Sequence, residues 1–217
     1  MKVSIIGAGN VGATAAYLLA QKNIVSEIVM VDRKESVIGK ALDMMCSSPL
    51  EPFDTVITGS VDYKDISGSS IVVITAGLAR QPGMSREDLL GKNKEIMESV
   101  CNSVKELCPD SIVIVVTNPL DVMCYVALNA TGFPKERVIG MAGVLDSARL
   151  RHFIAAELKV SPTKVEGLVL GAHGDSMVSL PKQTMVDGKA VSELLSAEKV
   201  AALVDRTAKC GGEIVKY

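Results

Sequence analysis

Residues 2–12 read KVSIIGAGNVG, and residues 27–32 read EIVMVD. The first stretch is a short apolar strand followed by a GxGxxG motif at 7–12, and the second is another apolar strand that ends at Asp32. Glycines at these three places permit a tight turn, close approach of the backbone to a pyrophosphate, and close packing of a helix on a strand. An acidic residue about 20 positions after the motif is suited to bind ribose hydroxyls. The two stretches therefore predict a βαβ unit that binds a dinucleotide.

The acidic residue also indicates which dinucleotide to expect. The carboxylate of Asp32 can accept hydrogen bonds from both ribose hydroxyls and would repel a 2′-phosphate, so NAD is favoured over NADP. Arg33 and Lys34 follow directly, and either could reach a phosphate, so some NADP use stays open. A purely structural glycine turn beside a surface aspartate is the alternative, which the complete context disfavours. The cofactor-binding residues predicted here are Gly7, Ala8, Gly9, Asn10, Val11, Gly12 and Asp32.

Short apolar runs rich in β-branched residues alternate with helical patterns as far as residue 141. Because the runs are continuously apolar, they predict strands covered on both faces, in a parallel sheet flanked by helices. The fold class predicted is α/β, with a Rossmann-type doubly wound parallel sheet. The expected strands are Lys2–Ile6, Glu27–Val31, Thr55–Thr58, Ser70–Thr75, Ile112–Thr117 and Arg137–Met141, and the expected helices are Asn10–Lys22, Ser36–Cys46, Arg86–Leu107 and Pro119–Ala130.

The pattern changes near residue 143, where we expect a domain boundary. A Rossmann domain is expected over 1–143, and a partial α+β substrate domain over 144–217. This second domain is short and ends within a helical pattern, so we expect it to be incomplete at its C-terminus. Its predicted elements are a helix over Asp146–Leu158, strands near Lys164–Leu170 and Gln183–Val186, a hairpin turn at 186–189, and a helix with Ser196 as N-cap.

Composition excludes several other classes of protein. Lys and Arg number 23 against 25 Asp and Glu, so no basic surface is expected for a nucleic acid. No run reaches the ~20 apolar residues of a membrane helix, and the first apolar run is too short for a signal peptide. We therefore expect a cytoplasmic protein. A metal or disulfide framework is not expected, and reduced buried thiols are, because no CxxC pair occurs among Cys46, Cys101, Cys108, Cys124 and Cys210.

Polar groups that could carry chemistry follow several strands. Ligands bind outside the carboxyl ends of strands in such sheets, where 75–77 (TAG) and 116–118 (VTN) are expected. Arg80 and Arg86 lie in a loop that could capture an anion or could be an ordinary solvated loop. His173 follows an apolar strand, and a carboxylate such as Asp146 beside it would fix its tautomer and favour the imidazolium. From spacing alone, a single histidine in a loop is more often a surface residue than a catalytic one.

Five motifs then stand in order: GAGNVG (7–12), ITAGLARQPGMSREDLL (74–90), VTNPLDVM (116–123), GMAGVLDSAR (140–149) and GAHGDSMV (171–178). Together they resemble the lactate/malate dehydrogenase family over the whole chain, most of all its malate dehydrogenases of the lactate-dehydrogenase-like type. The resemblance implies reversible, NAD-dependent oxidation of malate to oxaloacetate, a reaction of the tricarboxylic acid cycle. It also implies a homodimer or homotetramer.

Each residue that matches a family motif takes a role from that resemblance. His173 is expected to transfer the proton and Asp146 to be its carboxylate partner. Arg149 is expected to bind the substrate's C1 carboxylate, and Arg86, on a lid, to polarise the C2 oxygen. The further residues that the resemblance implies are Asn118 at substrate and nicotinamide, Asn93, Thr75, Ala76, Gly77, Val116 and Thr117 at the cofactor, and Arg80 at the position that sets specificity.

Arg80 favours malate on grounds of charge. Lactate enzymes typically carry a neutral glutamine there, whereas an arginine would face the second carboxylate of malate or oxaloacetate. Pyruvate would leave that arginine unpaired, which is costly in a closed site. Two alternatives remain: a lactate or other 2-hydroxy-acid dehydrogenase, and a catalytically impaired NAD-binding fragment.

Overall fold

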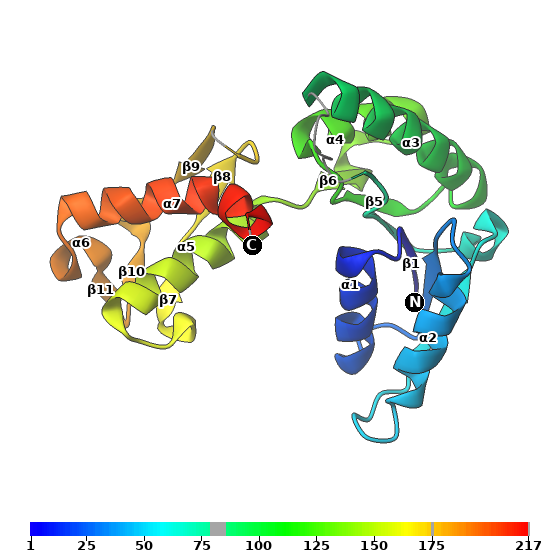
Figure 1. Ribbon diagram of the computed structural model, residues 1–217, viewed down its shortest axis with the longest axis horizontal. Helices are drawn as coiled ribbons and strands as arrows, with labels where there is room; N and C mark the ends of the chain where they lie inside the picture. The colour runs from blue at the N-terminus through cyan, green and yellow to red at the C-terminus, as the bar shows by residue number, and fades with distance from the viewer. Residues whose placement is uncertain (79–85, 175, 217) are drawn as a thin grey trace. The chain divides into compact units, whose positions relative to one another are not determined.

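The computed structural model describes residues 1–78, 86–174 and 176–216. The chain divides into two compact units, Met1–Gly140 and Met141–Tyr217 (Figure 1). Among the helices built from the described residues, none combines the length and the apolar character that crossing a membrane requires.

The first unit is built on a six-stranded sheet in the order β3-β2-β1-β4-β5-β6. Every neighbouring pair is parallel. The chain winds outward from β1 to β3, returns to the centre at β4, and then winds outward the other way. This doubly wound order confirms the predicted fold class and puts the switch point between β1 and β4, where ligands bind. The strands are β1 (Lys2–Ile6), β2 (Glu27–Val31), β3 (Val56–Ser60), β4 (Ile71–Ile74), β5 (Ile112–Val115) and β6 (Val138–Gly140).

The central strands are buried because helices cover the sheet. Ile5, Ile28 and Met30 are fully buried in one apolar cluster, as continuous apolar runs predict. Strand β4 is one residue shorter at each end than expected, and β5 ends two residues earlier than expected. Just after these strands, the hydroxyls of Thr75 and Thr117 donate to backbone carbonyls of neighbouring segments. The long helices are α1 (Asn10–Gln21), α2 (Ser36–Cys46), α3 (Arg86–Leu107) and α4 (Leu120–Thr131), with short 3₁₀ turns at Tyr63–Ile66 and Lys135–Arg137.

In the second unit, α5 and α7 lie side by side (Figure 1). Ser196 caps α7 as predicted, accepting the amide N–H of Lys199 at 3.4 Å. The predicted hairpin turn is present, with Asp187 at φ +51° and Gly188 at φ +80°. The elements are α5 (Gly143–Leu158), β7 (Val165–Glu166), β8 (Val169–Gly171), β9 (Met177–Ser179), β10 (Met185–Val186), β11 (Lys189–Ala190), α6 (Val191–Leu194) and α7 (Ala197–Val215), with 3₁₀ turns at Pro162–Lys164 and Pro181–Gln183.

The strand expected over Lys164–Leu170 is in fact two strands. Its first part, β7, pairs with β10, and its second part, β8, pairs with β9 in a separate hairpin. Gly167 lies between the two parts, where a side chain would come within 3.3 Å of Thr184. The antiparallel β9 and the short α6 were not expected, because each holds too few residues to show a period.

Candidate active site

Glycine is required at two of the three motif positions. Gly7 adopts φ +102°, and a Cβ there would lie 2.6 Å from the amide nitrogen of Ala76. A Cβ at Gly12 would lie 1.9 Å from the carbonyl oxygen of Gly7. A Cβ at Gly9, by contrast, would meet no atom within 4 Å. The space in front of Gly9 is therefore open to a ligand, at the N-terminus of α1, where phosphate groups bind.

Asp32 holds the turn together from the end of β2. Its Oδ2 accepts the N–H of Ala8 at 2.7 Å, and its Oδ1 accepts the N–H of Lys34 at 3.2 Å. A carboxylate offers about four acceptor positions, so these two bonds leave capacity for ribose hydroxyls. Thr75, the residue that follows β4, supports the turn, since its hydroxyl donates to the carbonyl of Gly7 at 2.7 Å.

A cavity of about 500 Å³ opens beside this turn. Its size is typical of a small-ligand site, and it has the aspartate and the glycine turn that a dinucleotide needs, so the residues fit NAD. Burial raises the pKa of the Tyr63 hydroxyl, and Asp32 raises it further, so this tyrosine stays uncharged. The cavity is lined by Ile6, Gly7, Gly9, Val31, Asp32, Arg33, Lys34, Tyr63, Thr75, Ala76, Gly77, Leu78, Ile96 and Val100.

Six residues of this wall were not predicted as site residues from the sequence, namely Ile6, Val31, Tyr63, Leu78, Ile96 and Val100. Ile96 and Val100 are spaced i, i+4 on α3, a pattern that equally indicates core packing. Tyr63 follows the carboxyl end of β3, which was the available signal, because ligands bind at that edge.

Asn93, buried at 1% exposure, ties two strand ends together. Its Oδ1 accepts the N–H of Leu78 at 2.8 Å, and its Nδ2 donates to the carbonyl of Asn118 at 2.8 Å. The hydroxyl of Thr117 donates to the carbonyl of Ala76 at 2.7 Å, while a Cβ on Gly77 would lie 2.6 Å from Thr117. These predicted site residues therefore gather at one sheet edge and brace one another.

Three other residues predicted at the cofactor lie nearby in the first unit. Asn10 begins α1, and Val11 in its first turn is 59% exposed. Val116 donates its N–H to the carbonyl of Ile74 at 2.9 Å, which places it at the end of β5. The peptide bond from Asn118 to Pro119 is cis.

In the second unit, one buried carboxylate joins two functional side chains. Asp146 lies in the first turn of α5 and is 1% exposed. Its Oδ2 lies 2.8 Å from Nδ1 of His173, and its Oδ1 lies 3.2 Å from Nη1 of Arg149. Because a carboxylate only accepts, Nδ1 of His173 carries the proton. The N-terminal turn of a helix is also a favourable place for a negative charge.

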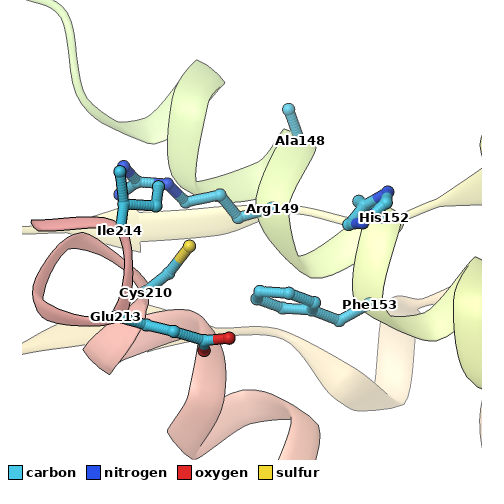
Figure 2. A pocket seen from close by; sticks show the side chains of 7 residues that line it. All are labelled: Ala148, Arg149, His152, Phe153, Cys210, Glu213 and Ile214. Carbon is cyan, nitrogen blue, oxygen red and sulfur yellow. The ribbon is translucent and has the colours of Figure 1, made fainter. Parts of the chain in front are cut away.

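Arg149 also borders a cavity of about 450 Å³ within the second unit. Figure 2 shows Arg149 reaching over it from α5, with residues of α7 opposite. Arg206 stacks over the ring of Phe153 at 4.3 Å and pairs with Glu213. The lining residues are Ala148, Arg149, His152, Phe153, Cys210, Glu213 and Ile214.

The remaining expectations have different outcomes. Arg80 lies outside the described residues, as does the side chain of Arg86, whose backbone begins α3. All five cysteines are free thiols, but the expectation that they are buried is wrong for Cys46, which is exposed on α2, and for Cys124, which is only half-buried. Within 1–78, 86–174 and 176–216, no three His, Cys, Asp or Glu side chains gather where a metal ion could bind.

The chain belongs to the lactate/malate dehydrogenase family. The family's NAD-binding domain matches residues 1–140, and its α/β C-terminal domain matches residues 143–217. This membership confirms the expected family and the expected cofactor, NAD.

Among its relatives, a malate dehydrogenase of Chloroherpeton thalassium is 56% identical over 218 residues, covering 100% of this chain and 70% of the relative. The solved malate dehydrogenase of Salinibacter ruber gives a TM-score of 0.94 at 52% identity, over 100% of this chain and 69% of that one. A lactate dehydrogenase of Cryptosporidium parvum, solved with lactic acid and NAD, gives a TM-score of 0.92 at 38% identity. The match covers 99% of this chain and 69% of that one.

Proposed function

We propose that this chain catalyses the reversible, NAD-dependent oxidation of malate to oxaloacetate, with His173 as the acid–base group. The observation that carries the proposal is the buried carboxylate of Asp146. One of its oxygens lies 2.8 Å from His173, the proton-transferring group, and the other lies 3.2 Å from Arg149, the carboxylate-binding group. The relatives named malate dehydrogenase at 52–56% identity support the same substrate.

His173 would exchange the proton through Nε2, the ring nitrogen that Asp146 does not hold. In malate oxidation, it accepts the C2 hydroxyl proton while the C2 hydride leaves. NAD, when bound, supplies the hydride acceptor. The imidazolium formed in this way is stabilised by the carboxylate of Asp146 at 2.8 Å. In the reverse direction, the imidazolium returns the proton to the forming alkoxide.

Arg149 would bind the C1 carboxylate, because a guanidinium presents a planar fork that matches a carboxylate. Its contact with Asp146 through Nη1 fixes where that fork lies relative to His173. We further assign Arg86 to the C2 oxygen, where a cation stabilises developing negative charge. Arg80 would pair with the second carboxylate of the substrate.

The substrate is tested by following NADH oxidation with oxaloacetate and with pyruvate. Oxaloacetate should react with the higher kcat/KM, and faster turnover of pyruvate would favour the alternative, a lactate dehydrogenase. The change Arg80→Gln should lower the oxaloacetate-to-pyruvate ratio by at least about tenfold, since a charge partner is lost. An unchanged ratio would show that Arg80 does not set specificity.

We also propose that the enzyme works in the cytoplasm as a homodimer or homotetramer. Family membership supports this assembly. Sedimentation equilibrium of the purified chain measures its mass directly, and a monomer at micromolar concentration would contradict the proposal.

A further inference from the structure

The residue at the centre of the glycine turn is held by charged side chains on both sides. Ala8 is buried at 3% exposure. Its N–H donates to Asp32 at 2.7 Å, and its carbonyl accepts from Nζ of Lys40 at 2.5 Å. Lys40 belongs to α2, the helix after β2. A lysine on an exposed helix surface thus extends to the backbone of the turn that faces the cofactor cavity.

This contact fixes the direction of a neighbouring donor. The carbonyl of Ala8 and the N–H of Gly9 belong to one planar trans peptide group, so they point in opposite directions. When Lys40 holds the carbonyl, the N–H of Gly9 is directed away from Lys40. Gly9 is the N-cap of α1 and lines the cavity, and a Cβ there would meet no atom within 4 Å.

The other peptide groups of the turn are held as well. The N–H of Gly7 donates to the carbonyl of Val31 at 2.8 Å, and its carbonyl accepts from the Thr75 hydroxyl at 2.7 Å. Among these bonds, those to Asp32 and Lys40 are charge-assisted and are therefore the stronger ones. Lys40 also places a positive charge close to the helix N-terminus, where anions already bind favourably.

We propose that Lys40 is a positioning residue for NAD, which orients the Ala8–Gly9 peptide group toward the pyrophosphate. The proposal rests on NAD binding and does not depend on the identity of the substrate. Lys40 acts through the backbone, so its loss should weaken cofactor binding and leave the chemical step intact.

The test compares Lys40→Met, which removes the charge, with Lys40→Arg, which keeps a donor, and with Lys22→Met. Lys22 is an exposed lysine just after α1 and serves as the matched control. NADH binding is measured by fluorescence titration. Lys40→Met should raise the Kd roughly tenfold, as expected for a charge-assisted hydrogen bond, while Lys40→Arg restores most of the affinity. Lys22→Met should bind as the parent chain does.

Two further measurements separate positioning from a general loss of structure. With saturating NADH, kcat of Lys40→Met should stay within twofold while KM for NADH rises. Calorimetry of Lys40→Met should show the same loss of affinity for ADP-ribose, which carries the pyrophosphate, and little loss of affinity for adenosine. An unchanged Kd for NADH, or an equal loss for adenosine, would overturn the role of Lys40. Failure of the parent chain to bind NADH would instead refute the cofactor assignment.

Discussion

The two units present functional groups in opposite ways. In the first unit, the glycine turn offers backbone groups to a ligand. It leaves no room for a side chain at Gly12, where a Cβ would lie 1.9 Å from a carbonyl oxygen. In the second unit, Asp146 gathers two side chains, one of them 27 residues away along the chain. The first arrangement should therefore be broken by adding atoms, and the second by changing the chemistry of single groups.

The largest effect is expected from His173→Gln, which keeps a polar side chain but removes the acid–base group. The value of kcat for oxaloacetate reduction should fall by roughly 10³, because general acid–base catalysis contributes 10²–10⁴. The Kd for NADH should stay within twofold. The matched control is His152→Gln, since His152 is the other histidine of the chain. Comparable losses of kcat in both variants would contradict the assignment.

Adding one methyl group to the turn tests the first unit. Gly12→Ala should cost about 3 kcal/mol of unfolding free energy and weaken NADH binding roughly hundredfold, because the turn must shift. Gly39→Ala is the control: Gly39 lies in α2, and its Cβ would meet nothing within 4 Å. The unfolding free energy of Gly39→Ala should rise by about 0.5–1 kcal/mol. Chemical denaturation and fluorescence titration give both quantities, and normal NADH affinity in Gly12→Ala would contradict the steric argument.

Arg149→Lys tests whether geometry or charge matters in the second unit. A lysine keeps the charge and loses the planar fork, so KM for oxaloacetate should rise about tenfold or more. Arg151→Lys is the comparison, because Arg151 donates to the carbonyl of Val165 at 2.6 Å. It should lower stability and leave KM within twofold. If Arg149→Lys has a normal KM in steady-state assays, Arg149 does not grip the carboxylate through its fork.

The smallest effect is expected in the labelling of the thiols, whose reactivity reports how deeply each cysteine is buried in its unit. Burial raises the pKa of Cys101 to about 12, so hardly any thiolate exists at pH 8. A disulfide reagent should therefore label the exposed Cys46 first, then Cys210, which borders a cavity, and Cys101 only after unfolding. Raising the pH to 10 should still leave Cys101 as thiol. Peptide mass mapping gives the order, and early labelling of Cys101 would contradict its burial.

Sequence patterns predicted the parallel sheet because buried strands are continuous apolar runs with clear turn signals. The Gly7–Gly12 turn was predictable for a steric reason. The pairing of His173 with Asp146 was different, since the residues alone offered it only as one possibility and the family resemblance singled it out. Lys40 and Tyr63 were missed because a lone lysine on a helix and a lone tyrosine after a strand carry no periodic signal.

The turn between β1 and α1 also depends on a strand made much later in synthesis. Gly7 packs against Ala76 and accepts from Thr75, although almost 70 residues separate these positions. While β4 has not yet left the ribosome, the nascent chain therefore lacks one wall of the turn. Such long-range closure slows folding, and a ligand stabilises only the state that binds it. NAD therefore stabilises the chain once β1 has paired with β4. It does not stabilise the first βαβ unit while that unit emerges alone.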